Sequence, residues 1–217
     1  MVFKTKDLRS APTHTDVIYQ DVKDMILTGK LKPNQRIRVR EVAESFNVSI
    51  GPTREAIQKL VSEKYLSITS RSEIKVVDYG KKDFDKLMEI MRVLDIYAVK
   101  GLLKRISNKE IDELKKMNSK LNDYYKRKKI QLFANQANDI HKAIWALYDN
   151  DFICNTLTQA IEKITMIASN YLSYYSPEIF KKSWVQHNAL IDAIEKRDAR
   201  LLEKILIDHY SEDYFSD

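Results

Sequence analysis

Hydrophobic residues recur every three or four positions along most of the chain, and this spacing predicts a mostly α-helical protein. A first helix is predicted over about residues 16–28, and Gly29 is placed to end it. Two shorter helices follow, over about residues 39–46 and 50–63, and Asn47 between them suits a left-handed turn. The N-terminal part of the chain therefore begins with three helices.

A different pattern follows the third helix. Between residues 65 and 79, hydrophobic and polar positions alternate, with the hydrophobic set at Leu66, Ile68, Ile74 and Val76. The polar run between the two pairs can turn the chain back. Two short strands after three helices predict a winged helix-turn-helix, with the two strands as its wing.

From Lys81 onward the helical spacing returns and persists to the C-terminus. The chain contains only four glycines and four prolines, so few residues interrupt long helices. After the long first helix of this part, further helices are predicted near residues 108–127, 130–149, 151–174, 178–196 and 198–213. This part is expected to form an all-α bundle of about six helices. The predicted division is a flexible N-terminal arm, a winged helix-turn-helix and a helical domain, over residues 1–15, 16–78 and 79–217.

Charge and composition narrow the possible functions. The net charge of +6 is concentrated at the N-terminal end, where residues 1–78 carry +4, and this balance permits nucleic-acid binding. The single cysteine, Cys154, excludes an intramolecular disulfide and fits a reducing compartment. No apolar run reaches the roughly 18 residues of a membrane span, and the N-terminus lacks the apolar core of a signal peptide. We expect a cytoplasmic protein without a membrane partner.

The second and third helices have the pattern of a DNA-reading unit. The third helix starts with small or polar residues and ends with apolar ones, so a slim end can enter the major groove while the other end stays in the core. Ser49, Thr53 and Arg54 are expected to project from that slim end, with Arg40 and Arg71 beside it. The alternative is an ordinary helical hairpin with solvated arginines.

Residues 17–77 resemble the winged helix-turn-helix of the GntR family of bacterial regulators. The resemblance is carried by Ile26-x-x-Gly29-x-Leu31-x-Pro33, Val42-Ala43 and Val48-Ser49-x-x-Pro52-x-Arg54-Glu55-Ala56-x-x-x-Leu60. It implies that double-stranded DNA is contacted by Arg40, Ser49, Ile50, Gly51, Thr53, Arg54, Ser70 and Arg71. This chain has Ile50 where the family usually has arginine and Lys64 where it usually has glycine, so its operator is expected to be unusual.

Residues 83–213 resemble the all-helical FCD domain of one GntR subfamily. The matching pieces are Met91-Arg92-Val93-Leu94-Asp95, Ile140-His141-x-x-Ile144 with Asn150, and Gln186-His187-x-x-Leu190-Ile191-x-Ala193-Ile194-x-x-Arg197-Asp198-Ala199 with His209. In the FCD family, three histidines and one acidic residue bind a divalent metal beneath a small-molecule pocket. The resemblance implies metal ligands at His141, His187 and His209, and imidazole suits zinc or nickel.

Two positions of this second resemblance leave alternatives open. The family's acidic ligand would lie one turn before His141, where this chain has Ala137, so water or an effector carboxylate completes the site, or the metal has been lost. Arg92 matches an arginine that faces the family's pocket and binds a carboxylate effector. Its alternative is an ion pair with Asp95 or another neighbour.

Together these patterns predict a homodimeric transcriptional regulator, a repressor by expectation, that binds a pseudo-palindromic operator and responds to a small organic acid. It is not expected to be an enzyme. One alternative is a metal-dependent, hydrolase-like enzyme that uses the three histidines, whose turnover would survive deletion of residues 1–78. The other is a dimeric structural factor that binds DNA without any effector.

Overall fold

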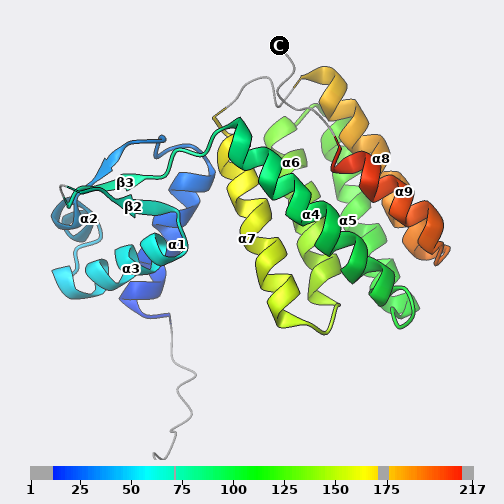
Figure 1. Cartoon of the computed structure of the whole chain (residues 1–217), viewed down its shortest axis with the longest axis horizontal. Coiled ribbons are helices and arrows are strands. Elements are labelled where there is room, and N and C mark those ends of the chain that lie inside the picture. The colour runs from blue at the N-terminus through cyan, green and yellow to red at the C-terminus, as the bar shows by residue number, and fades with distance from the viewer. Residues whose placement is uncertain (1–11, 71, 171–175, 212–217) are drawn as a thin grey trace, which may run out of the picture. The chain divides into compact units, whose positions relative to one another are not determined.

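The structure is a computed structural model that describes residues 12–70, 72–170 and 176–211. The chain divides into two compact units, residues 1–79 and 80–217. Helices dominate both units, and the strands belong to the first (Figure 1). The mostly α-helical class predicted from the spacing is confirmed. None of the described helices is long and apolar enough to cross a membrane.

The N-terminal unit holds three helices, α1 (His14–Leu27), α2 (Val39–Ser45) and α3 (Ile50–Ser62). Helix α1 begins at a capping box, in which the Thr13 hydroxyl accepts from the backbone amide of Asp16 and the Asp16 carboxylate accepts from Thr13. Gly29 follows the helix with a φ of 68°. Asn47 has a φ of 52° and makes the tight turn into α3. These boundaries agree with the sequence prediction.

The wing has one strand more than predicted. Its strands are β1 (Arg36–Ile37), β2 (Leu66–Ile68) and β3 (Ile74–Val76), arranged antiparallel in the order β1-β3-β2. In this register Leu66 lies opposite Val76, and Ile37 lies opposite Ile74. Strand β1 has only two residues, which is too short for an alternating pattern to reveal. The predicted two-stranded wing is therefore corrected to a three-stranded sheet.

The core of the N-terminal unit joins α1, α3 and the sheet. Ile18 and Ile26 of α1 pack toward Ile57 and Leu60 of α3, and all four side chains are almost fully buried. Burying an aliphatic side chain of this size stabilises the fold by about 1.5 to 3 kcal/mol. This core fixes α3 from one side and leaves its other side exposed.

The helical unit contains six helices among the described residues. They are α4 (Lys81–Leu102), α5 (Asn108–Lys126), α6 (Ile130–Ala146), α7 (Asp151–Ala168), α8 (Pro177–Glu195) and α9 (Ala199–His209). Side chains of Ser107, Asn150, Ser176 and Asp198 accept from the first backbone amides of α5, α7, α8 and α9. The predicted helices are confirmed, except that α7 ends at Ala168 rather than near residue 174; residues 171–175 lie outside the described part.

The described helices of the helical unit pack against one another around a shared core. Helix α4 packs against α7 and α9, while α5 packs against α6 and α8. Most of the core is apolar, and Trp145 is its largest fully buried side chain. Asp95, His141 and His187 are also buried there, each at most 3% exposed. Buried groups that can carry charge require partners, so this part of the core is a candidate binding site.

Candidate functional site

The leading end of α3 is exposed in the way a DNA-reading helix requires. Ser49 occupies the N-cap position, and its hydroxyl makes no hydrogen bond to the helix amides. Ile50 is 44% exposed, and Gly51 and Arg54 are exposed as well. A side chain at Gly51 would meet nothing within 4 Å. Backbone amides at such a helix start, with an arginine beside them, can bind phosphate or a guanine edge.

Thr53 does not belong to this exposed set. Its side chain is fully buried, and its hydroxyl donates to the backbone carbonyl of Ser49 at 3.2 Å. Position 53 falls on the same side of α3 as Ala56, Ile57 and Leu60, which form the buried stripe. The expectation that Thr53 touches DNA is therefore corrected, because the residue supports the helix from within.

The flanking positions are partly described. Arg40 is exposed in the first turn of α2, and Ser70 is exposed between β2 and β3. Arg71 lies outside the described residues. Glu55 accepts a hydrogen bond from the Thr15 hydroxyl of α1 at 3.2 Å, so it has a partner within the unit. The exposed positions Arg40, Ser49, Ile50, Gly51, Arg54 and Ser70 constitute the candidate DNA-binding surface.

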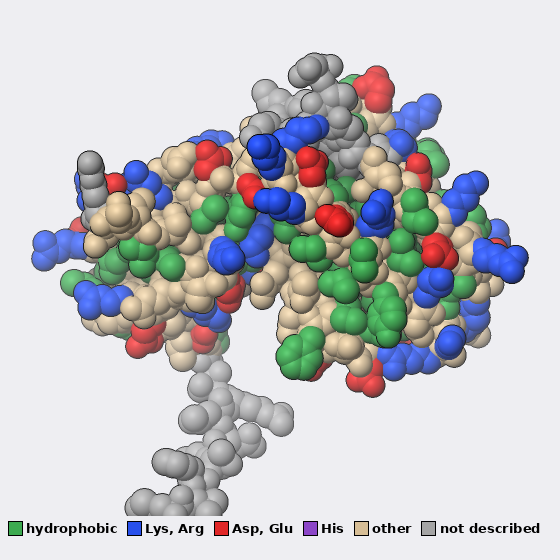
Figure 2. Space-filling view, viewed as in Figure 1, with side chains coloured by type: hydrophobic (Ala, Val, Ile, Leu, Met, Phe, Trp, Pro, Cys, Tyr) green, Lys and Arg blue, Asp and Glu red, His purple; other side chains and the backbone are tan. Residues whose placement is uncertain are grey.

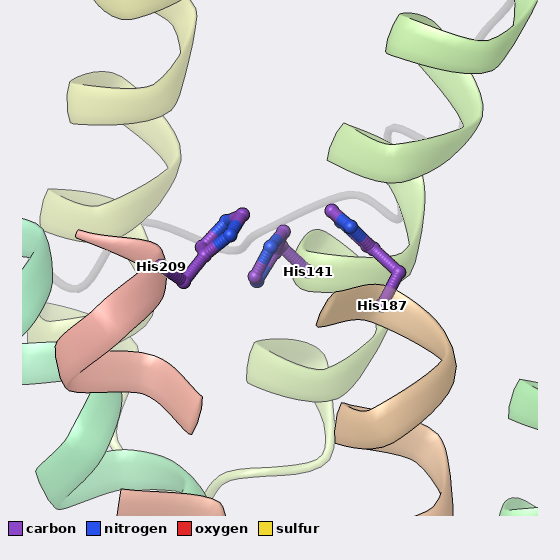
Figure 3. Close-up of side chains that lie close together, drawn as sticks. All are labelled: His141, His187 and His209. Carbon is purple, nitrogen blue, oxygen red and sulfur yellow. The ribbon is translucent and has the colours of Figure 1, made fainter. Parts of the chain in front are cut away.

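In the helical unit the three predicted histidines converge from three helices. His141 comes from α6, His187 from α8 and His209 from the last residue of α9, and their rings point toward one another (Figure 3). Their ring centroids are 5.1 to 5.3 Å apart. One nitrogen from each ring lies within 4.8 Å of the other two. This spacing suits one small cation bound by all three rings.

Hydrogen bonds fix the orientation of two of these rings. Nδ1 of His187 lies 2.7 Å from the backbone carbonyl of Ser183, so this nitrogen donates. Nδ1 of His209 lies 2.8 Å from the side-chain carbonyl of Gln186, whose amide donates to Asp208 at 2.9 Å. In both rings the hydrogen is thereby held on Nδ1, so the lone pair that could bind a metal is the one on Nε2.

In the part of the chain that the structure describes, buried ring nitrogens of His141 and His187 lack hydrogen bonds, and this bears on whether the site fits a metal. Among the described residues, Nε2 of His187 and both nitrogens of His141 are buried without a hydrogen bond. An unsatisfied buried polar atom costs about 1 to 3 kcal/mol. A divalent cation at the meeting point of the rings would satisfy Nε2 of His187 and one nitrogen of His141, so the donor set fits zinc or nickel.

The protonation of the cluster also favours metal binding. Burial, with a further contribution from His141, lowers the pKa of His187 from 6.5 to about 3. Burial, and then the rings of His187 and His141, lower the pKa of His209 well below 6.5. Both rings are therefore neutral near pH 7, and a neutral imidazole is the form that binds a metal.

Asp95 is a member of this site that the sequence prediction missed. Its side chain is fully buried on α4; Oδ1 accepts from the indole N–H of Trp145 and Oδ2 from the hydroxyl of Tyr210, each at 2.5 Å. Oδ2 also lies 3.5 Å from Nδ1 of His141. A carboxylate behind a histidine is a common arrangement around metals, because it orients the ring and makes it a better ligand. The signal was present, since position 95 lies on the buried stripe of α4 with Phe84, Met91 and Ala98.

Ala137 occupies the position, one turn before His141, where the family has its acidic ligand. Ala137 is buried and lines a cavity beside His141. The neighbouring Asn138 also lines this cavity, and its amide donates to the Thr165 hydroxyl at 2.9 Å. The chain thus provides no carboxylate one turn before His141, and Asp95 approaches the same ring from α4.

The cavity extends from the histidines between α4, α6, α7, α8 and α9. It is partly open to solvent, and all three histidines line it. Arg92 does not line it: that side chain is exposed and borders a separate surface hollow with Val93, Ile96 and Ile207. The expectation that Arg92 faces the effector pocket is corrected, because its position on α4 lies away from the buried stripe.

Comparison with known families agrees with both halves of this description. Residues 14–76 match the gntR family of bacterial regulatory proteins, and residues 86–212, more than half of the chain, match the FCD domain. The chain belongs to the GntR family and carries an FCD domain. The resemblance expected from the sequence is confirmed. This GntR/FCD protein is therefore a transcriptional regulator with an effector-binding domain.

Individual relatives extend over most of the GntR/FCD chain. The HTH-type transcriptional regulator McbR of Escherichia coli is 23% identical over 181 residues, covering 83% of this chain and 82% of McbR. The gluconate operon transcriptional repressor of Bacillus subtilis is 21% identical, covering 98% and 88%. The solved structure of E. coli McbR/YncC has the same fold, with a TM-score of 0.79 at 22% identity and coverage of 92% and 94%. These relatives are regulators, so the enzyme alternative is not supported.

Proposed function

We propose that this GntR/FCD regulator is a homodimeric repressor that binds a pseudo-palindromic operator and releases it when an organic acid binds the helical domain. A divalent metal held by His141, His187 and His209 would receive the acid's carboxylate. Since DNA is the proposed partner, we place the protein in the cytoplasm.

The exposed leading end of α3 is the observation that carries the proposal. Its buried stripe anchors the helix, while Ser49, Ile50, Gly51 and Arg54 remain accessible at the other side. Arg54 can form two hydrogen bonds with a guanine edge, and the first backbone amides of α3 can donate hydrogen bonds to a phosphate. Arg40 and Ser70 extend the same role to the start of α2 and to the wing.

A hydrophobic stripe on α4 supports the dimer. Ile90, Val93 and Tyr97 are 40%, 60% and 62% exposed, and their i, i+3, i+7 spacing places them on one side of the helix. Phe152, on the adjacent α7, is 88% exposed. Figure 2 shows hydrophobic side chains gathered on this face of the helical unit. We assign the stripe to contact with a second copy, because a two-fold operator needs a paired protein and solvent-facing apolar patches commonly mark interfaces.

The metal would be bound by neutral imidazoles from three helices, with Asp95 behind His141. Such an ion supplies a Lewis acid that binds and neutralises a carboxylate. The residues of the chain do the rest: Ser183 and Gln186 hold the rings in position, and the cavity beside Ala137 admits the ligand. Zinc and nickel both suit this set of nitrogen ligands.

The regulation follows from linkage. If the acid binds better to a dimer whose two α3 helices are spaced wrongly for the operator, DNA affinity falls by the same factor by which DNA weakens acid binding. A hundredfold change requires about 2.7 kcal/mol of differential binding. This amount is small beside the total free energy of DNA binding.

Substitution of Arg54 tests the DNA-binding part. An operator selected from random duplexes should bind Arg54→Ala more weakly by about 1 to 3 kcal/mol per half-site, because one arginine contact per recognition helix is lost. Arg200→Ala is the matched control, since Arg200 is an exposed arginine on α9 and its loss changes the charge equally. Both affinities are measured by fluorescence anisotropy at one salt concentration. Equal operator affinity of the two variants would contradict the assignment.

A further inference from the structure

The walls of the histidine cavity are mostly hydrophobic. Eleven of its twenty lining residues are aliphatic, methionine or phenylalanine, and the set includes no lysine, arginine, aspartate or glutamate among the described residues. Met88 and Met91 of α4 and Ile161 and Ile164 of α7 are among the eleven. A charged part of a ligand would therefore find a partner only at the histidine end.

One wall of the cavity is aromatic. Phe133 of α6 and Phe180 of α8 meet edge to face with ring centroids 4.6 Å apart, and both line the cavity. The Tyr125 ring lies tilted against Phe180, with centroids 4.9 Å apart, and stacks on Trp184 with centroids 4.4 Å apart. Rings held by several neighbours in this way form a stable apolar surface for a hydrocarbon group.

The neutral polar side chains of the lining have partners within the protein. The Asn138 amide donates to Thr165 at 2.9 Å, and the Thr165 hydroxyl donates to the Ile161 carbonyl at 2.8 Å. Gln131 donates to Asn135 at 3.1 Å. Each of these side chains has only its remaining lone pairs or amide hydrogen left for a ligand, too few to satisfy the many hydroxyl groups of a sugar acid. The lining therefore disfavours a polyhydroxylated acid.

We infer that the effector is an amphipathic carboxylic acid, with its carboxylate at the three histidines and an alkyl or aryl tail against Ile164, Phe133 and Phe180. Sugar acids are rejected, which separates this chain from the relative that is named for gluconate. The inference rests on the proposed function, because it takes the carboxylate to be bound at the histidine cluster. It adds the chemistry of the remainder of the ligand, which the walls select.

Tail length provides the test. The full-length protein loaded with zinc is titrated by calorimetry with butyrate, hexanoate, octanoate, 4-phenylbutyrate and gluconate. Each methylene buried contributes about 0.8 kcal/mol, so affinity should rise up to roughly fourfold per added methylene from butyrate to octanoate. Gluconate should bind at least tenfold more weakly than octanoate. Equal affinity along the series, or gluconate binding as tightly as octanoate, would overturn the inference.

Two variants locate the tail. Ile164→Thr places a hydroxyl in the hydrophobic wall and should weaken octanoate binding about tenfold while zinc affinity stays unchanged. Ile207→Thr is the matched control, because Ile207 is 44% exposed on α9 and does not line the cavity. If Ile164→Thr does not fold, Phe180→Leu tests the aromatic wall and should reduce the preference for 4-phenylbutyrate over hexanoate. Octanoate affinity that is equal in the folded cavity variant and in Ile207→Thr contradicts the placement.

The outcome can be separated from failure of the proposed function. Operator binding and its dependence on Arg54 are measured without any acid, and zinc binding is measured on its own. If zinc binds and a polyhydroxylated acid releases the operator, the proposed function stands and the inference about the tail is wrong. If zinc and every acid of the series fail to bind while the operator still binds, both the metal-linked effector site and the tail inference fail, and only DNA binding survives.

Discussion

We expect the carboxylate of Asp95 to set which nitrogen of His141 would bind a metal. Oδ2 of Asp95 lies 3.5 Å from Nδ1 of His141, and this contact favours the tautomer with its hydrogen on Nδ1 and a free lone pair on Nε2. In Asp95→Asn, the amide oxygen keeps the bond from Trp145, which donates to Oδ1 in the carboxylate. The NH₂ group then takes the place of Oδ2, where it faces both Tyr210 and Nδ1 of His141. That donor favours the opposite tautomer, whose Nε2 carries the hydrogen and cannot bind the metal.

The expected loss is large enough to measure. Removal of a carboxylate partner from a metal-binding histidine weakens metal affinity by about 10- to 100-fold, or about 1.4 to 2.7 kcal/mol. The complete burial of Asp95 supports a value toward the upper end, because no water can replace the missing acceptor. The increase in thermal stability on adding zinc should shrink correspondingly.

Competition with a chromophoric chelator measures the zinc affinity of each variant. Asp139→Asn is the matched control, since Asp139 lies two residues before His141 on α6 but is exposed to solvent. Circular dichroism of the metal-free proteins checks that Asp95→Asn retains its helices. Tyr210→Phe removes one donor to Asp95 but keeps the carboxylate, and should change zinc affinity less than threefold. Zinc affinities of Asp95→Asn and Asp139→Asn that agree within a factor of two would refute the orienting role of Asp95.

Three further predictions concern backbone strain, assembly and pH. Lys64→Gly should raise the free energy of unfolding by about 0.5 to 1 kcal/mol in a denaturant titration, because Lys64 has a φ of 63°, which glycine adopts without strain; no gain would refute the strain. Val93→Asp should give a monomer in light scattering, whereas Leu132→Asp on α6 should leave a dimer; a dimeric Val93→Asp protein would argue against the α4 stripe. Since the pKa of His187 falls to about 3 in the fold, the unfolded chain takes up a proton below pH 6.5 that the folded chain does not. The stability of metal-free protein should therefore fall between pH 6.5 and 5 by up to about 1.4 kcal/mol per pH unit, less steeply in His187→Gln, and a slope that is equal in both proteins would contradict the burial argument.

Most of the fold was accessible from the sequence because its elements are long and regularly patterned. The six helices of the second unit have hydrophobic residues at helical spacing and side-chain caps such as Ser107 and Asn150, so their starts were predicted within a residue or two. Strand β1 was missed because two residues cannot show an alternating pattern. Its pairing with β3 is set by tertiary contacts rather than by local sequence.

The candidate sites were less accessible, for reasons that differ between residues. His141, His187 and His209 were found through a family resemblance, and the structure brings them together from three helices. Thr53 was misjudged because residues near the start of a helix alternate between buried and exposed within one turn. Asp95 was overlooked because an acidic residue on an amphipathic helix is usually placed on the solvent side.

The three departures from the family pattern have different physical consequences, and this difference indicates where the specificity of the chain lies. Lys64 only adds backbone strain, so it affects stability. Ile50 is 44% exposed at the leading end of α3, where an apolar side chain can contact the methyl group of thymine but cannot grip guanine as arginine does. Ala137 replaces a carboxylate with a methyl group beside His141, so the cavity wall there is apolar. Two of the three changes therefore lie on surfaces proposed to meet a ligand, and both make that surface more hydrophobic.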